Sequence, residues 1–155
     1  MFNRLLPQAI DNTYRGYKLA LWLFALTVLV KVGISLASIF NGYHAASSAD
    51  GIPLDTFTPT GVQAVVTLFA LLGNAQLMIG LLCILVLFRY RAMIPLMFVL
   101  LLLEYLARRL ILQFMPIATT TAPPGLFVNL ALLALMIVGL VLSLLNRDNP
   151  QAPRS

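Results

Sequence analysis

Four stretches of this sequence are each apolar for about twenty residues, and this feature limits the fold more than any other. A helix of roughly 20 apolar residues crosses the hydrocarbon core of a bilayer. Because lipid offers no hydrogen-bond partner to an open backbone, and four segments are too few to close a barrel, each stretch must be helical. The sequence predicts an all-α, integral membrane four-helix bundle, with a single transmembrane domain over residues 1–155. The predicted spans are residues 17–40, 62–88, 93–114 and 126–145, with outer loops over 41–61 and 115–125.

The composition agrees with a membrane environment. Hydrophobic residues make up 61% of the chain and charged residues only 10%, whereas soluble domains are about half apolar and a quarter charged. The net charge of +5 does not indicate nucleic-acid binding, because the basic residues lie mostly at the ends of the apolar stretches. At those positions Lys and Arg interact with lipid headgroups and set the orientation of the helices.

The distribution of basic residues predicts the orientation. Arg89 and Arg91 lie in the turn between the second and third spans, and further basic residues flank the first span and follow the last. The two predicted outer loops contain no Lys or Arg. By the positive-inside rule, both termini are expected on the cytoplasmic side. This architecture is similar to that of small four-helix proteins of bacterial inner membranes, which implies a multi-pass protein of that membrane and implies no function.

The segment before the first span has a different pattern. Residues 1–10 place Phe2, Leu5, Leu6 and Ile10 among polar residues, together with Arg4. This pattern is typical of a short amphipathic helix that lies in the membrane interface. We therefore expect an N-terminal interfacial helix ahead of the bundle.

One observation excludes a class of membrane enzymes. Cys83 is the only cysteine of the chain and lies inside an apolar stretch. Dithiol chemistry needs two thiols, so the sequence excludes the mechanism of the vitamin K epoxide reductases and of the quinone-linked disulfide oxidases, which are also four-helix membrane proteins. We interpret Cys83 as a small buried residue.

Ionisable residues inside the predicted spans are the strongest functional signal. Lys31 lies thirteen residues after Lys18, and Glu104 lies thirteen residues after Arg91, on two helices that run in the same direction. At 1.5 Å per residue, both side chains lie about 20 Å from the cytoplasmic side. Opposite charges at the same depth predict a salt bridge, and intramembrane charges by default indicate a functional site.

More polar residues are expected near this pair. Arg108 lies one helical turn beyond Glu104, whereas Arg109 points about 100° away from Arg108. Ser35 continues the polar face of Lys31, and Asn129 of the last span lies at a similar level. We predict a ligand-binding cavity in the outer half of the bundle, with an excess of positive charge. Its candidate residues are Lys31, Ser35, Glu104, Arg108, Arg109 and Asn129. The alternative is a structural role, in which polar groups hold helices together and the arginines extend to the interface.

The first outer loop contains His44, Asp50 and Asp55. One histidine and two aspartates at irregular spacing do not make a metal-site pattern, so no metal site is predicted. We expect a solvated loop, or a lid over the outer end of the cavity.

Three functions fit these features. The first is a binding or accessory protein that holds a lipid-like or anionic amphiphile, or a partner membrane protein. The second is a homo-oligomeric transporter or channel that uses the buried charges. The third is a membrane enzyme with Glu104 as acid or base, which is disfavoured because neighbouring cations keep a carboxylate ionised. No catalytic residue and no cofactor is predicted; the expected partners are membrane lipids and no nucleic acid, and homo-oligomerisation is left open.

Overall fold

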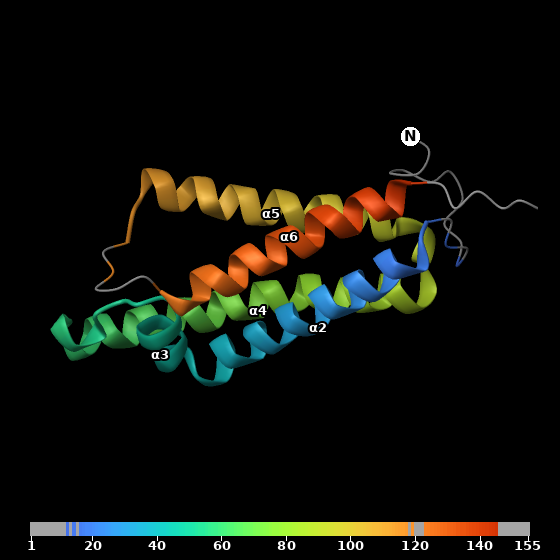
Figure 1. Ribbon diagram of the computed structural model, residues 1–155. Helices are drawn as coiled ribbons and strands as arrows, with labels where there is room; N and C mark the ends of the chain where they lie inside the picture. Colours follow the sequence, from blue (N-terminus) through green and yellow to red (C-terminus); the bar gives the residue numbers. More distant parts are fainter. Residues whose placement is uncertain (1–11, 13, 15, 118, 120–122, 146–155) are drawn as a thin grey trace, which may run out of the picture.

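The computed structural model describes residues 12, 14, 16–117, 119 and 123–145. Within these residues every regular element is helical. The four long helices are α2 (Lys18–Phe40), α4 (Pro59–Arg89), α5 (Ile94–Phe114) and α6 (Pro124–Leu144) (Figure 1). Their bounds lie within three residues of the predicted spans. The predicted interfacial helix over residues 1–10 lies outside the described part of the chain.

Short helical elements connect the long ones. Between α2 and α4 the chain forms α3 (Gly42–His44), the π-helix η1 (Ala45–Ala49) and the 3-10 helix η2 (Leu54–Thr56). A single 3-10 turn, η3 (Arg91–Met93), joins α4 to α5. We call the end of the molecule at η3 proximal and the opposite end distal. Residues 41–58, which connect α2 to α4 at the distal end, are called the cap.

Three of the described helices are long and apolar enough to cross a membrane, namely α2, α4 and α6. This finding is compatible with a multi-pass membrane protein. Helix α5 has a similar length but carries Glu104, Arg108 and Arg109 in its second half. These charges set α5 apart from the other three long helices.

The start of α4 differs from the expected one. The sequence Thr60-Gly61-Val62-Gln63 resembles a capping box, which predicts a helix beginning at Val62. In the structure α4 begins at Pro59, and the Thr58 hydroxyl accepts a hydrogen bond of 3.2 Å from the Gly61 N–H. Proline is favoured at the first helical position because its fixed φ suits a helix and its missing N–H needs no partner. Thr58 is therefore the N-cap residue, and Thr60 lies in the first turn.

Glycines allow α2 and α4 to approach closely. A Cβ added to Gly73 would lie 2.9 Å from the Ser35 carbonyl oxygen, and one on Gly80 would lie 2.8 Å from a methyl of Val32. Small residues of this kind bring helix backbones together in membranes. The polar face of α2 is buried in the interior, with Thr27 and Ser35 fully inaccessible.

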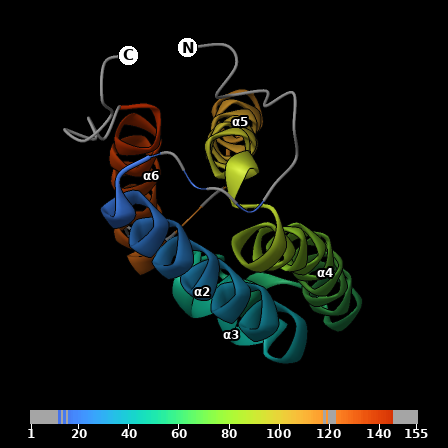
Figure 2. The same cartoon turned by 90° about the vertical axis from the view of Figure 1, so that its right-hand side faces the viewer.

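The main apolar core lies in the proximal half. Phe24 of α2 and Phe98 of α5 meet edge to face with ring centroids 5.1 Å apart, and Met136 of α6 packs into the same core. Viewed along the helices, α5 lies opposite α2, with α6 and α4 on either side (Figure 2). The last buried residue of α5 is Tyr105, so the distal third of α5 has no buried side chain. Figure 1 shows that α4 and α5 separate as they run away from η3.

A second, smaller core holds the cap on α4. Ala46, Ile52 and Leu54 are buried and pack against Val62, Val65 and Phe69 of the first turns of α4. On its other side the cap contacts the start of α6. Gly125 is required there, because an added Cβ would lie 2.9 Å from the Ala49 carbonyl oxygen.

A cavity beneath the cap as candidate functional site

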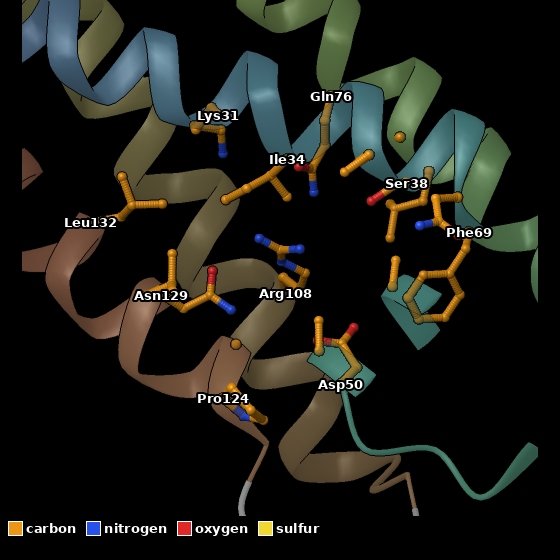
Figure 3. Close-up of a pocket in the computed structure, with 18 of the residues that line it drawn as sticks. Lys31, Ile34, Ser38, Asp50, Phe69, Gln76, Arg108, Pro124, Asn129 and Leu132 are labelled. Carbon is orange, nitrogen blue, oxygen red and sulfur yellow. The ribbon is translucent and has the colours of Figure 1, made fainter. Parts of the chain in front are cut away.

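The long helices and the cap enclose a cavity of about 320 Å³ in the distal half. All four long helices contribute to its wall, and the cap contributes Asn41, His44, Ala45, Ala49 and Asp50. Most of the lining is apolar, with side chains such as Ile34, Phe69 and Leu132 (Figure 3). Cavities of roughly 300–1,000 Å³ with an apolar wall and a few polar groups are typical of small-molecule sites. The cavity lies at the level of Lys31 and beyond it toward the cap.

Lys31 and Glu104 form the predicted salt bridge. The Lys31 Nζ donates to Glu104 Oε2 at 2.5 Å, between helices that are far apart in the sequence. The Lys31 side chain is 8% exposed and that of Glu104 is 22% exposed. A charge-assisted hydrogen bond of this kind offsets part of the cost of removing both charges from water. Lys31 lines the cavity, whereas Glu104 lies behind the wall.

Arg108 is held less tightly than Lys31. Its guanidinium lies 3.8 Å from Glu104 Oε1, which is beyond a hydrogen bond, and its side chain is about one-third exposed. Because Glu104 makes its short contact with Lys31, no described residue accepts a hydrogen bond from Arg108. The guanidinium instead points into the cavity between Asn129 and Asp50 (Figure 3). Arg108 is therefore available to bind an anionic group.

Arg109 and Ser35, both candidate residues, do not line the cavity. Arg109 is exposed on the outer face of α5, as its 100° offset from Arg108 permits. Ser35 is fully buried, and its hydroxyl donates a hydrogen bond of 2.8 Å to the Lys31 carbonyl oxygen. The structure therefore brings Lys31, Arg108 and Asn129 together at the wall, and places Ser35 behind it.

Two side-chain amides in the wall have no protein partner. Gln76 is 8% exposed, Asn129 is partly buried, and both line the cavity. Neither side chain forms a hydrogen bond with any described residue. Figure 3 shows both amides directed toward the same space as Arg108. Polar groups in such positions are normally hydrogen-bonded, so the cavity is suited to water or to the polar part of a ligand.

The cap supplies a residue that the sequence did not assign to the cavity. Asp50 follows η1 and lines the distal end of the cavity, with one carboxylate oxygen near Gly125 at the start of α6. Asp50 remains exposed on one side. Partial burial by the surrounding wall raises the pKa of its carboxyl above the usual value, and the nearby Arg108 charge opposes this rise. The Arg108 charge therefore acts on the Asp50 carboxyl although the two groups form no salt bridge.

This arrangement changes the expected charge of the site. With Arg109 on the outer face and Asp50 in the wall, two cations (Lys31 and Arg108) face two carboxylates (Glu104 and Asp50). These four groups carry no net formal charge, whereas the predicted set, which contains Arg109 and lacks Asp50, carries a formal charge of +2. The distal part of the cavity thus combines the Arg108 cation with the Asp50 carboxylate, which form no salt bridge with each other.

The remaining polar groups of the cap do not form a metal site. No group of three or more His, Cys, Asp or Glu that could hold a metal occurs among the described residues. His44 Nδ1 lies 3.1 Å from the Ser48 hydroxyl, one turn away, and Asp55 is exposed in η2.

Comparisons with known proteins give no family. The chain matches no protein-family model, no curated protein and no solved structure. The function has to be inferred from the cavity itself.

Proposed function

We propose that this chain is a four-span membrane protein, with both termini in the cytoplasm, that binds an amphiphile in the cavity beneath the cap. The apolar surfaces of α2, α4 and α6 support membrane insertion. The charges of α5 are compatible with a fourth span, because Glu104 is paired with Lys31 and the exposed Arg109 can extend to the headgroup layer. The distribution of Lys and Arg supports the orientation. A bacterial inner membrane is the location that this architecture suggests.

The observation that carries the binding proposal is the combination of apolar and unpaired polar groups in one cavity. Ile34, Leu72 and Val128 offer an apolar wall, and all three remain partly exposed. Gln76 and Arg108 offer side-chain hydrogen-bond donors that no described residue accepts. A molecule with a polar head and an apolar chain complements both kinds of surface. A purely structural role accounts for the Lys31–Glu104 pair but leaves these donors unexplained.

The separation of α4 and α5 supports a route for the apolar chain. Beyond Tyr105 the side chains of α5 are exposed or only partly buried, and Arg108 lines the cavity from this part of the helix. Leu68, Leu71 and Leu72 of α4 are also exposed. In a membrane these side chains would contact lipid, so an acyl chain can leave the cavity on this side while its headgroup stays beneath the cap.

A pair of asparagine variants tests the binding proposal. Asn129→Phe adds bulk to the cavity wall, whereas Asn74→Phe adds the same bulk to an exposed position of α4 outside the cavity. Native mass spectrometry of the detergent-purified proteins should show a bound amphiphile on the wild type and on Asn74→Phe, and none on Asn129→Phe. Circular dichroism and gel filtration should show that both variants keep their helices and their oligomeric state. A wild type that carries only bulk lipid, or equal loading of all three proteins, would overturn the proposal.

A further inference from the structure

The charges of Arg108 and Asp50 in the cavity indicate which headgroup it binds. Arg108 and Asp50 both line the distal part of the cavity and are directed toward it (Figure 3). Among the described residues, the salt bridges are Lys31–Glu104 and Arg108–Glu104, so Asp50 has no cationic partner within 4.0 Å. A cation with only a 3.8 Å salt bridge and no hydrogen bond to a described residue, and an anion without a salt bridge, therefore face the same space. They come from different elements, since Arg108 belongs to α5 and Asp50 to the cap.

We propose that the cavity binds a zwitterionic headgroup, with an anionic group on Arg108 and an ammonium on Asp50, as found in an aminophospholipid. This inference rests on the proposed function and adds the chemistry of the headgroup. Arginine presents several donors in a planar fork that suits phosphate oxygens. A carboxylate accepts hydrogen bonds from an ammonium. An anionic lipid without an amine would leave Asp50 facing a second negative charge, which is unfavourable.

The inner part of the cavity supports this assignment. Lys31 is occupied by Glu104, so it adds little net charge to the space that it lines. The amides of Gln76 and Asn129 carry both donors and acceptors without a net charge. They can bind the ester or glycerol oxygens of a lipid next to its phosphate. Arg108 and Asp50 are thus the two lining groups whose charge selects among headgroups.

The absence of a side chain at Gly125 leaves room for Asp50 beside the start of α6. The Cβ position of Gly125 lies 3.2 Å from an Asp50 carboxylate oxygen and 2.9 Å from the Ala49 carbonyl oxygen. The carboxylate is therefore close to the first turn of α6, where the positive end of the helix dipole favours a negative charge. Asp50 remains exposed on its other side. A ligand ammonium can approach from that side.

Binding to lipids with matched chains tests the proposal. The probes are dioleoyl phosphatidylethanolamine, dioleoyl phosphatidylglycerol and dioleoylglycerol, each titrated against the detergent-purified protein and followed by native mass spectrometry. The wild type should bind the ethanolamine lipid about tenfold more tightly than the glycerol lipid, as expected for one additional hydrogen bond to a charged group. Dioleoylglycerol, which has neither charge, should bind more weakly than both phospholipids.

Matched variants assign the two charges. Asp50→Asn should abolish the preference for the ethanolamine lipid, whereas Asp55→Asn, in the same cap but outside the cavity, should keep it. Arg108→Gln should remove the advantage of both phospholipids over dioleoylglycerol, whereas Arg109→Gln should not. An unchanged preference in Asp50→Asn or in Arg108→Gln would overturn the assignment of that residue and with it the zwitterion proposal.

The outcomes separate this proposal from the one on which it rests. Equal or tighter binding of the phosphatidylglycerol by the wild type would refute the zwitterionic headgroup and leave amphiphile binding intact. Binding of none of the three lipids above bulk lipid would refute both. O-Phosphoethanolamine, the headgroup without chains, provides a further arm. If it displaces the ethanolamine lipid at equal concentration, the ligand is a free zwitterion and the amphiphile proposal is overturned.

Discussion

Replacing Glu104 by glutamine removes the charge that faces the buried Lys31 ammonium and keeps the size of the side chain. Breaking a buried ion pair costs about 3–5 kcal/mol, because the remaining charge stays buried without a partner. Since the glutamine amide oxygen can still accept a hydrogen bond from the Lys31 ammonium, we expect the lower limit of about 3 kcal/mol. This cost corresponds to a decrease of about a hundredfold in the equilibrium constant for folding.

The assay is equilibrium unfolding in mixed micelles with increasing sodium dodecyl sulfate, followed by circular dichroism. Asp55→Asn is the matched control, since Asp55 is exposed and forms no salt bridge with a described residue; its effect should stay within about 0.5 kcal/mol. The double variant Lys31→Met with Glu104→Met should recover most of the loss, because apolar replacement of a whole buried pair is often neutral. If Glu104→Gln is as stable as Asp55→Asn, the pair is not a buried interaction and the reasoning fails.

Orientation, helix packing and the titration of Asp50 can each be tested separately. A reporter fused to the C-terminus should read cytoplasmic and one inserted beside Asp55 should read external; the reverse result would refute the proposed orientation. Gly73→Ala should destabilise the protein because its Cβ would lie 2.9 Å from the Ser35 carbonyl oxygen, whereas Gly33→Ala, with nothing within 4 Å, should not; similar unfolding midpoints for both would contradict the close approach of α2 and α4. Because the pKa of Asp50 is raised, the folded state binds its proton more tightly than the unfolded state does. The contribution of Asp50 to the free energy of unfolding therefore falls as the pH rises above the usual pKa of 3.8. The stability gained by Asp50→Asn should therefore be larger at pH 7 than at pH 3.5 in thermal unfolding, and a difference of the opposite sign would contradict the burial of the carboxyl.

The regular part of the molecule was predictable because helical periodicity and residue counting apply to it. Counting from Lys18 and Arg91 placed Lys31 and Glu104 at the same level, and the two side chains form a salt bridge. The bounds of the four long helices followed from apolar length, although among the described helices only α2, α4 and α6 are apolar enough to cross a membrane. By contrast, both Thr58 and Thr60 have the chemistry of an N-cap, and the position of Pro59 at the first helical turn decides between them.

The position of Asp50 could not be predicted in the same way. It follows a π-helix within an irregular cap, where no fixed rise per residue relates sequence to depth. Counting residues along α5 also could not show whether Arg108 or Arg109 faces the interior, because this depends on how α5 packs on α6. The predicted set included Arg109 and lacked Asp50, so it carries more positive charge than the group of Lys31, Arg108, Glu104 and Asp50. The balanced pair of Arg108 and Asp50 emerges only from the three-dimensional arrangement.

The length of α4 has a consequence for the membrane around the protein. With 31 residues against 21 to 23 in the other long helices, α4 is about 46 Å long, whereas the hydrocarbon layer is about 30 Å thick. The helix must tilt or protrude, and its distal turns carry the cap. Because α4 joins α5 through the short η3 turn, we expect a change in its tilt to alter the spacing of the two helices at the distal end. We therefore expect bilayer thickness to act on the width of the cavity, so that a thicker membrane, which favours an upright α4, changes ligand access without any contact to the ligand.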